Sequence, residues 1–591
     1  MNFPQKRNVN VAAVSKRKHD LSHYHVGTTD FGRMKVVECR YMVPGDEFNC
    51  NIGCETRVLN PMPSPTIGQF DFVYRSFFVP IHNIWSPFYD FLKNQQTAVN
   101  GVLTNVVSSP YIRHSTLFNY FNTPSYGFVE NVANPSSVSD YDYSYYLGST
   151  TNKVYRKFTK KGRIIFDFLN SFGINIPLDG PLDRKLYIIL PLVAFWKFYF
   201  DWIVPSRFVR EHEDYIQLFI DTLNNNVGSE VSAADFFKFL VHEPLAYFLD
   251  DFFTTATFFP FSDPVNQQDV ITIVNPESSD FLSPSVSANN EAFYLEGGSG
   301  SRAINTQDYF NMYTLQTLGK LQDLLNRNLI AGTKVQDWLL TEFGIKPNND
   351  SLHLSTYLGS KRNSLQVADV ISNADTEAQG GTALGSYAGY INNRNKFDFG
   401  YNSQEHGFFF ITCELVPRTS YYQGLAAQFD MGDRFDFFQP EFDNQQGMPI
   451  PFRRLYFSSH EAGENAPDDT PFGFQLQYSD LKFAPDVISG DFRTRFGLEL
   501  KSWFLGRDMS YLAQDPNFHH GIVEDFCLVK TQYQDWHYIF SDMNDELDPF
   551  LVAFYINNHA MRPMKSITEG FEPTYQQSGK NVNLDFSGSV K

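Results

Sequence analysis

Aromatic and β-branched residues gather in widely spaced blocks, and several blocks alternate between apolar and polar positions as a half-buried strand does. Residues 70–79 (FDFVYRSFFV) begin with this alternation and stop before Pro80, and residues 407–416 (GFFFITCELV) also stop before a proline. Three further blocks have similar composition, at residues 434–438, 472–478 and 550–556. No helical pattern follows each strand in regular order. The sequence therefore predicts antiparallel pairing and disfavours a doubly wound parallel sheet.

Helical patterns occur in the connections between these blocks. Residues 305–332 carry apolar residues at spacings of three and four, with Asn305 as the N-terminal cap and Gly332 as the end. A second helix is predicted over residues 334–343, and a short one over residues 85–92. Three low-complexity stretches are predicted to be loops, at residues 131–146, 275–302 and 373–389.

The amino-acid composition shows in addition that the chain must bury a large apolar surface. Aromatic residues make up 16% of the 591 residues and charged residues only 19%, which excludes a disordered chain. The formal net charge of −19 also excludes a basic protein that coats nucleic acid. Such a chain hides its apolar surface either in a large core or in large subunit interfaces, and composition leaves both open.

The five cysteines are scattered, which is typical of free thiols in a reducing compartment. Residues 186–204 are the most apolar segment, but Pro191, Lys197 and Asp201 interrupt it. We therefore expect a buried or interface segment and no membrane insertion. The opening residues are polar and basic and do not have the pattern of a signal peptide.

Candidate chemical sites are weak. The glycine-rich residues 297–302 lack the Lys-Ser/Thr of a P-loop and are expected to form a surface loop. Residues 542–553 resemble a calcium loop, but Leu547 and Ala553 stand where an EF-hand needs Gly and Glu. A solvated turn is the simpler interpretation, and a looser cation site stays open.

Histidines and cysteines near the beginning of the chain do not have the tight spacing of a zinc site; they are His23, His25, Cys39, Cys50 and Cys54. His406 could act as a base, but a hydrogen-bonded core or interface histidine is the simpler interpretation. No catalytic constellation exceeds the chance background, so we expect no enzyme, no cofactor and no metal.

Positive charge is concentrated at the beginning of the chain. Five cations precede the first acid, Asp20: Lys6, Arg7, Lys16, Arg17 and Lys18. They could contact phosphates, in a manner independent of base sequence and weakened by salt, or they could form a solvated tail.

In order along the chain, a series of short motifs resembles the major capsid protein of the Microviridae, the small icosahedral single-stranded DNA phages, and especially its gokushovirus-like branch. The motifs are the block around His23; the Pro44-Gly45-Asp46 turn; Phe77, Phe78, Pro80 and Trp85; Glu405-His406-Gly407; Gln423-Gly424; and Arg562-Pro563. Each motif is weak alone, but their order over roughly residues 19–566 is specific. Residues 209–249 and the tail after Thr568 depart from the family pattern.

The resemblance implies a mainly β fold, an eight-stranded antiparallel viral jelly roll with helices in long interstrand loops. It implies an interior-facing arm at residues 1–30, a capsid domain at 31–568 and a tail at 569–591. Candidate protrusion loops are residues 209–249 and 265–302, the second being the more plausible exposed tip.

The resemblance also implies a virion protein that is assembled in the cytoplasm of a bacterial host. Sixty copies would form pentamers and a T=1 shell around circular single-stranded DNA. The implied partners are further copies of the chain, the packaged DNA, a small basic DNA-binding protein, a pilot protein and the bacterial cell surface. The five cations of the arm would then lie inside the shell.

Two other classes of protein remain as alternatives. A carbohydrate-binding or hydrolytic β-sandwich would also be rich in aromatic residues, and so would a cellular oligomeric scaffold.

Overall fold

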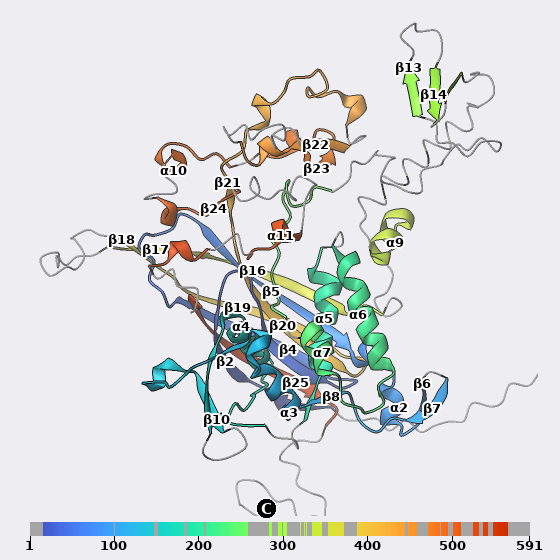
Figure 1. The fold of residues 1–591 in the computed structure, drawn as a ribbon, viewed down its shortest axis with the longest axis vertical. Coiled ribbons are helices and arrows are strands. Elements are labelled where there is room, and N and C mark those ends of the chain that lie inside the picture. The colour runs from blue at the N-terminus through green and yellow to red at the C-terminus, as the bar shows by residue number, and fades with distance from the viewer. Residues whose placement is uncertain are drawn as a thin grey trace, which may run out of the picture.

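Two antiparallel sheets form the centre of the computed structural model, which describes most of residues 16–564 (Figure 1). The longest stretches outside the described residues are 258–282, 304–319, 372–386, 458–470 and 510–523, together with 1–15 and 565–591. The predicted helix at 305–332 lies almost entirely outside the described residues.

The first sheet has five strands, with β25 in its middle. Strands β1 (Arg17–Asp20) and β2 (His23–Thr29) pair with successive parts of β25 (Phe550–Arg562). On the other side of β25 lie β4 (Glu47–Val58) and then β19 (Asn392–Asn402). The block predicted at 550–556 is therefore a strand, and it continues to Arg562.

The second sheet has four strands in the order β16 (Thr356–Gln366), β5 (Gln69–Pro80), β20 (Gly407–Pro417) and β3 (Met34–Met42). The strands predicted at 70–79 and 407–416 are confirmed as β5 and β20. Both end at a proline, which has no N–H to continue the ladder. Antiparallel pairing is confirmed in both sheets.

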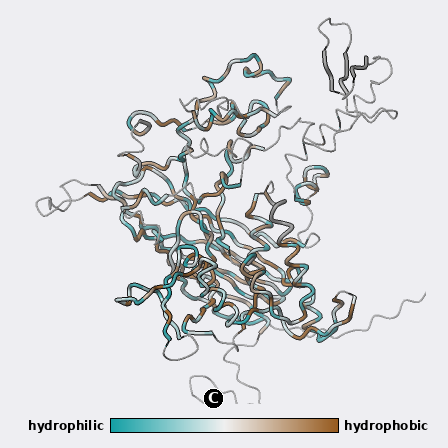
Figure 2. The backbone as a smooth tube through the Cα atoms, viewed as in Figure 1, coloured by the Kyte–Doolittle hydropathy of each residue, from teal (hydrophilic) through white to brown (hydrophobic). Residues whose placement is uncertain are grey.

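The two sheets pack face to face around one apolar core. Alternate side chains of β4 and β25 point inward, including Phe48, Ile52 and Phe554, and they meet residues of the second sheet such as Phe72 and Ile411. This layering makes the protein a β-sandwich. Hydrophobic and hydrophilic residues are accordingly mixed along the central strands, whose side chains alternate between the core and the outside (Figure 2).

Helices cover the other face of the second sheet and form a second core with it. Phe77 of β5 and Phe410 of β20 contact helix α5 (Leu190–Phe198), whose Phe198 stacks on Phe77 with 4.3 Å between ring centroids. Residues 189–204 of the apolar segment are mostly buried, as expected, whereas Leu186 and Ile188 before them are exposed. Among the described residues no helix is long and apolar enough to cross a membrane.

The remaining helices and turns surround these cores. The α-helices are α1 (Ile81–Ile84), α2 (Phe88–Leu92), α3 (His114–Phe121), α4 (Lys160–Ser171), α6 (Val209–Asn224), α7 (Ala233–Asp235), α9 (Val335–Phe343), α10 (Asp491–Thr494) and α11 (Glu524–Cys527). In the described part of the chain, the π-helical turns are η3 (Tyr199–Ile203) and η4 (Phe236–Leu240). The 3-10 turns are η1 (Pro124–Tyr126), η2 (Val138–Asp140), η7 (Ala427–Phe429), η8 (Pro440–Phe442), η9 (Phe452–Arg454), η12 (Ser479–Lys482), η13 (Lys501–Trp503) and η15 (His537–Ile539).

Seven small sheets lie in the connections among the described residues. They join β10 (Tyr143–Tyr146), β11 (Lys153–Phe158) and β9 (Val129–Asn131); β12 (Leu186–Ile188) and β8 (Tyr111–Arg113); β13 (Ser283–Val286), β14 (Phe293–Gly297) and β15 (Gly300–Ala303); β17 (Ala368–Ile371) and β18 (Tyr387–Tyr390); β21 (Ser420–Tyr421) and β24 (Gly506–Arg507); β22 (Gly447–Pro451) and β23 (Pro471–Leu476); and β6 (Gln96–Val99) and β7 (Val102–Asn105).

Some local predictions are confirmed and others are wrong. Helix α9 matches the prediction at 334–343, and Gly344 ends it with φ of 66°. The helix predicted at 85–92 begins only at Phe88, because Pro87 disfavours helical backbone at the residue before it. The predicted loop at 131–146 ends in strand β10. In the predicted loop at 275–302, Gly297 pairs with Gly300 in a β-hairpin.

Candidate assembly surfaces and the residues that shape them

The Pro44-Gly45-Asp46 turn joins β3 to β4 and is held by a buried ion pair. Gly45 has φ of 89°, a conformation that favours glycine. The buried carboxylate of Asp46 accepts the backbone N–H of Val43 at 2.9 Å and pairs with Arg562 Nη2 at 2.8 Å. Two motifs that are far apart in the sequence, Pro44-Gly45-Asp46 and Arg562-Pro563, therefore meet at one point. Pro563 directly follows Arg562 of this ion pair.

The Glu405-His406-Gly407 motif lies at the start of β20, and its residues make contacts that hold neighbouring segments together. Glu405 pairs with His82 at 2.9 Å, and His406 Nδ1 lies 2.6 Å from the Tyr41 hydroxyl with the two rings stacked. Burial lowers the pKa of His406. A Cβ on Gly407 would lie 2.3 Å from the Phe78 ring, so close packing requires glycine here.

Phe77, Phe78, Pro80 and Trp85 follow one another from β5 into the helical layer. Phe77 faces the helices, whereas Phe78 faces the sandwich core, as the alternation of a strand requires. The Trp85 indole is fully buried and donates to the Asn226 carbonyl at 3.0 Å. These motif residues tie the second sheet to its helical cover.

Gln423 and Gly424 tie together loops from distant parts of the chain. Gln423 accepts the Met509 N–H at 2.6 Å and donates to Asp508 at 3.0 Å. A Cβ on Gly424 would lie 1.8 Å from the Arg454 carbonyl oxygen. The predicted motif residues thus lie at junctions between segments and are not gathered in one active site.

His23 is part of a charged contact between β2 and β3. Its Nε2 lies 2.9 Å from the buried Glu38, which also binds Arg40 at 2.6 Å. The hydrogen bond to Glu38 raises the pKa of His23. Among the described residues no group of histidines, cysteines and acids has the geometry of a metal site, and all five cysteines are free thiols.

The described part of the basic segment is folded. Arg17 and Lys18 lie in β1, paired with Arg562 and Met561 of β25, and Lys16 directly precedes them. Residues 17–20 and 23–29 are strands of the first sheet, so an unpaired arm could comprise only the residues before them. Lys6 and Arg7 lie outside the described residues.

Sequence reasoning missed a buried ionic cluster around Asp30. His537 lies 2.9 Å from its carboxylate, Lys530 also contacts it, and Arg33 is 3.7 Å away. Burial opposes ionisation of Asp30, but the His537 hydrogen bond and the positive charges of Lys530 and Arg33 hold its pKa well below the usual range. Arg33 also pairs with Asp548 at 2.6 Å. Asp548 is the last acidic residue of the calcium-like segment at 542–553.

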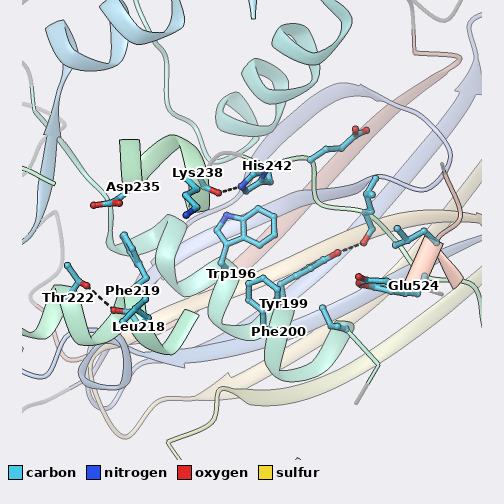
Figure 3. A pocket seen from close by; sticks show the side chains of 15 residues that line it. Trp196, Tyr199, Phe200, Leu218, Phe219, Thr222, Asp235, Lys238, His242 and Glu524 are labelled. Carbon is cyan, nitrogen blue, oxygen red and sulfur yellow. Dashed lines mark hydrogen bonds between the residues drawn. The ribbon is translucent and has the colours of Figure 1, made fainter. Parts of the chain in front are cut away.

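A cavity of about 470 Å³ lies among the helices and has mostly apolar walls. Figure 3 shows Trp196, Tyr199 and Phe200 on one side of it and Leu218 and Phe219 on another. At one edge of the cavity, burial raises the pKa of Tyr247, and the hydrogen bond that its hydroxyl donates to Glu524 acts in the same direction. Among the described residues that line the cavity, no nucleophile lies next to a base, so the lining does not resemble an active site.

An exposed aromatic segment lies far along the chain, and it corrects a predicted strand. Residues 434–438 form a turn, because Asp436 accepts the backbone N–H groups of Gly432 and Asp433 at 2.8 and 2.6 Å. The rings of this segment are exposed: Phe429 74%, Phe435 38%, Phe437 57% and Phe438 53%. We call residues 429–438 the aromatic loop.

Comparison with known proteins identifies the class to which this sandwich belongs. The family model described as "Capsid protein (F protein)" matches residues 7–165 and 304–570. These segments make up more than half of the chain, so the chain belongs to this family. It is a phage capsid protein, and the family is structural, not enzymatic.

Three relatives carry the description capsid protein VP1. That of Chlamydia phage 1 is 24% identical over 250 residues, covering 41% of this chain and 39% of the relative. That of Bdellovibrio phage phiMH2K is 28% identical over 207 residues, covering 34% and 37%. That of Spiroplasma virus 4 is 26% identical over 238 residues, covering 40% of each. The chain matches less than half the length of each relative. The expected resemblance to the gokushovirus-like Microviridae is confirmed.

Proposed function

We propose that this chain is the major shell-forming protein of its virion and that copies of it assemble into a closed icosahedral container for single-stranded DNA. The observation that carries the proposal is the aromatic loop, read together with family membership. Several exposed phenylalanines within ten residues are unfavourable in water, and such patches are typical of protein–protein contacts. The sugar-binding and hydrolytic alternatives have no comparable support.

The order of strands supports a jelly roll. Strands β1 and β2 follow the same edge of β25 and act as one interrupted strand. Counted so, each sheet has four strands, β1/β2-β25-β4-β19 facing β3-β20-β5-β16. Successive strands along the chain then lie in alternate sheets, except that β5 and β16 are neighbours in the second sheet. This alternation is what a rolled-up antiparallel ribbon produces.

Residues 265–302 are the better candidate for an exposed protrusion. Helix α6 from the other candidate, residues 209–249, packs Ile216, Phe219 and Ile220 into the helical core. Strands β13, β14 and β15, in contrast, pair only with one another among the described strands. Both candidates lie in the part that the family model does not match, between residues 165 and 304. In this proposal, the protrusion at residues 265–302 is the part that contacts the bacterial surface.

The net charge of −19 is a reason to expect further partners. An acidic shell repels packaged phosphate unless cations lie on its inner side. The residues before β1 would supply some of them, and a small basic protein would supply others. A pilot protein and assembly in the host cytoplasm belong to the same proposal.

The test is the assembly state of the purified chain, with and without single-stranded DNA, by size-exclusion chromatography and electron microscopy. We expect pentamers or shells. Replacing Phe437 and Phe438 together by Ser should leave a folded monomer, whereas Val138→Ser, at a site that is 77% exposed, should not change assembly. A wild-type chain that stays monomeric under all these conditions would overturn the proposal.

A further inference from the structure

The first sheet has a face that the rest of the described chain leaves open. Along β4 and β25 every second side chain is buried, such as Cys50, Ile52 and Ile556, and the side chains between them point away from the sandwich. The helices pack against the second sheet instead. We call this outward surface of β2, β25, β4 and β19 the free face.

One row of residues across the free face has an unusual composition. The strand register aligns Tyr24 with Tyr555, Tyr555 with Gly53, and Gly53 with Lys396. Tyr24 is 75% exposed and Tyr555 46% exposed, and their rings meet edge to face with 5.3 Å between centroids. Two aromatic rings are therefore held at a fixed angle on the surface without being covered.

The glycine of this row leaves room beside the rings. A Cβ at Gly53 would contact Tyr555 side-chain atoms at 3.6 and 3.7 Å. Because Gly53 has no side chain, the surface beside the Tyr555 ring is formed by the backbone and leaves one face of the ring accessible. On the far side of Gly53 from Tyr555, Lys396 is exposed and makes no ion pair with the described residues. A planar group that stacked on Tyr555 would have a cation on its far side.

The charges of the free face suit a polyanion better than the rest of the chain does. Its described lysines and arginines are equal in number to its acids, namely Arg57, Arg394 and Lys396 against Glu47, Glu55 and Asp398, in a chain of net charge −19. Arg57 and Arg394 both pair with Glu55, at 2.5 and 3.3 Å, which masks that carboxylate. Lys16, just before β1, adds a cation at the edge.

The remaining side chains favour nucleic acid over another copy of the chain. Exposed asparagines are frequent on this face, at positions 49, 392, 402 and 557. Subunit interfaces are depleted in charged residues at their centre, and the aromatic loop is a much more apolar candidate for that role. Isolated rings among amides and cations are instead typical of surfaces that stack unpaired bases.

We propose that the free face binds single-stranded DNA, with Tyr24 and Tyr555 stacking unpaired bases and Lys396 contacting the phosphate backbone. This inference rests on the proposed packaging function, and it extends the DNA contact from the residues before β1 to the sheet itself. Stacking does not depend on base identity, because every base has an aromatic face, so the surface suits a whole genome.

The test compares binding of two fluorescent probes to the full chain by anisotropy: a twenty-residue oligothymidylate and an abasic oligonucleotide of equal length. The Tyr24→Ala/Tyr555→Ala variant should bind the oligothymidylate at least about 25-fold more weakly, since each of the two lost base stacks contributes about fivefold or more. Binding of the abasic probe should change less than twofold. Tyr24→Phe/Tyr555→Phe keeps both rings and should bind as wild type does.

A matched control exists in another sheet. Tyr146 is 53% exposed, with Lys153 over its ring at 6.0 Å, and Tyr146→Ala should leave binding of both probes unchanged. Lys396→Gln should weaken binding of both probes alike and reduce its salt dependence. Equal oligothymidylate affinity of wild type and the double alanine variant would overturn the proposal.

Particle formation separates this proposal from the proposed function. Variant shells that form normally but retain less DNA support binding at the free face. If the double alanine variant folds but forms no shells, the tyrosines are subunit contacts and the DNA proposal is wrong. If even the wild type forms no shells, the proposed function fails, and the anisotropy comparison still decides whether the face binds DNA.

Discussion

At the scale of single residues, the clearest dependence is that of the Asp46 turn on Arg562. Asp46→Ala removes the partner of an arginine whose side chain is only 15% exposed. Breaking a buried ion pair in this way destabilises a protein by about 3 kcal/mol, because the remaining charge stays desolvated. Denaturant unfolding monitored by tryptophan fluorescence would measure the loss.

The control for this prediction is Asp398→Ala on the same sheet. Asp398 is exposed and its carboxylate accepts a hydrogen bond from Asn51. Exposed substitutions of this kind change stability by about 0.5 kcal/mol or less. Similar losses in the two variants would contradict the role given to the Asp46–Arg562 pair.

The His23–Glu38 contact predicts a dependence of stability on pH. Because the folded protein raises the pKa of His23, the contact stabilises the fold fully below the unfolded value of about 6.5. That contribution is lost as pH rises through the raised pKa. His23→Gln should therefore lower the unfolding midpoint more at pH 5.5 than at pH 8.5.

The companion variant is His559→Gln, an exposed histidine of the same sheet that lies 3.8 Å from Asp20. Its effect should be small at both pH values, since the partner is exposed as well. An effect of His23→Gln that did not vary with pH would show that the ring acts by packing and not by charge.

At the scale of elements, the close packing of two loops leaves no room for a side chain at Gly424. Gly424→Ala would force a methyl group against the Arg454 carbonyl, and such overpacking costs about 1–3 kcal/mol. Gly432→Ala, eight residues away, meets nothing within 4 Å and should be neutral. Differential scanning fluorimetry of both variants checks this, and equal melting temperatures would refute it.

The elements also mark how far sequence reasoning reaches. Blocks such as 407–416 are predictable because a strand buried on both faces is continuously apolar. Residues 434–438 have the same composition, but the Asp436 turn overrides it, and only tertiary context distinguishes the two. The strand at 143–146 was missed because its tyrosines and serines read as low complexity.

The candidate site was predictable only as motifs and not as contacts. Asp46 and Arg562 were each singled out, yet nothing in their spacing joins two residues 516 positions apart. The Asp30 cluster was missed for the same reason, since Lys530 and His537 come from the opposite end of the described chain. The free face was hidden because Tyr24 and Tyr555 become neighbours only through β-strand register.

At the scale of the whole molecule, the residues before β1 should govern retention of the genome and not formation of the shell. Replacing Lys6 and Arg7 by Gln removes two cations, and the slope of log affinity against log salt should fall by about 1.4 for single-stranded DNA if both contact phosphate. Asn8→Gln/Asn10→Gln is the neutral control in the same segment. An unchanged slope would exclude these two cations from the DNA contact.

The pairing of β25 with both β2 and β4 has a consequence for biosynthesis. A ribosome makes β1 to β4 within the first sixty residues, but the strand that joins them begins only at Phe550. The sheet therefore cannot close until residues 550–562 have been translated, and contacts this distant in sequence form slowly. Nascent chains that still lack β25 would be unable to join a growing particle.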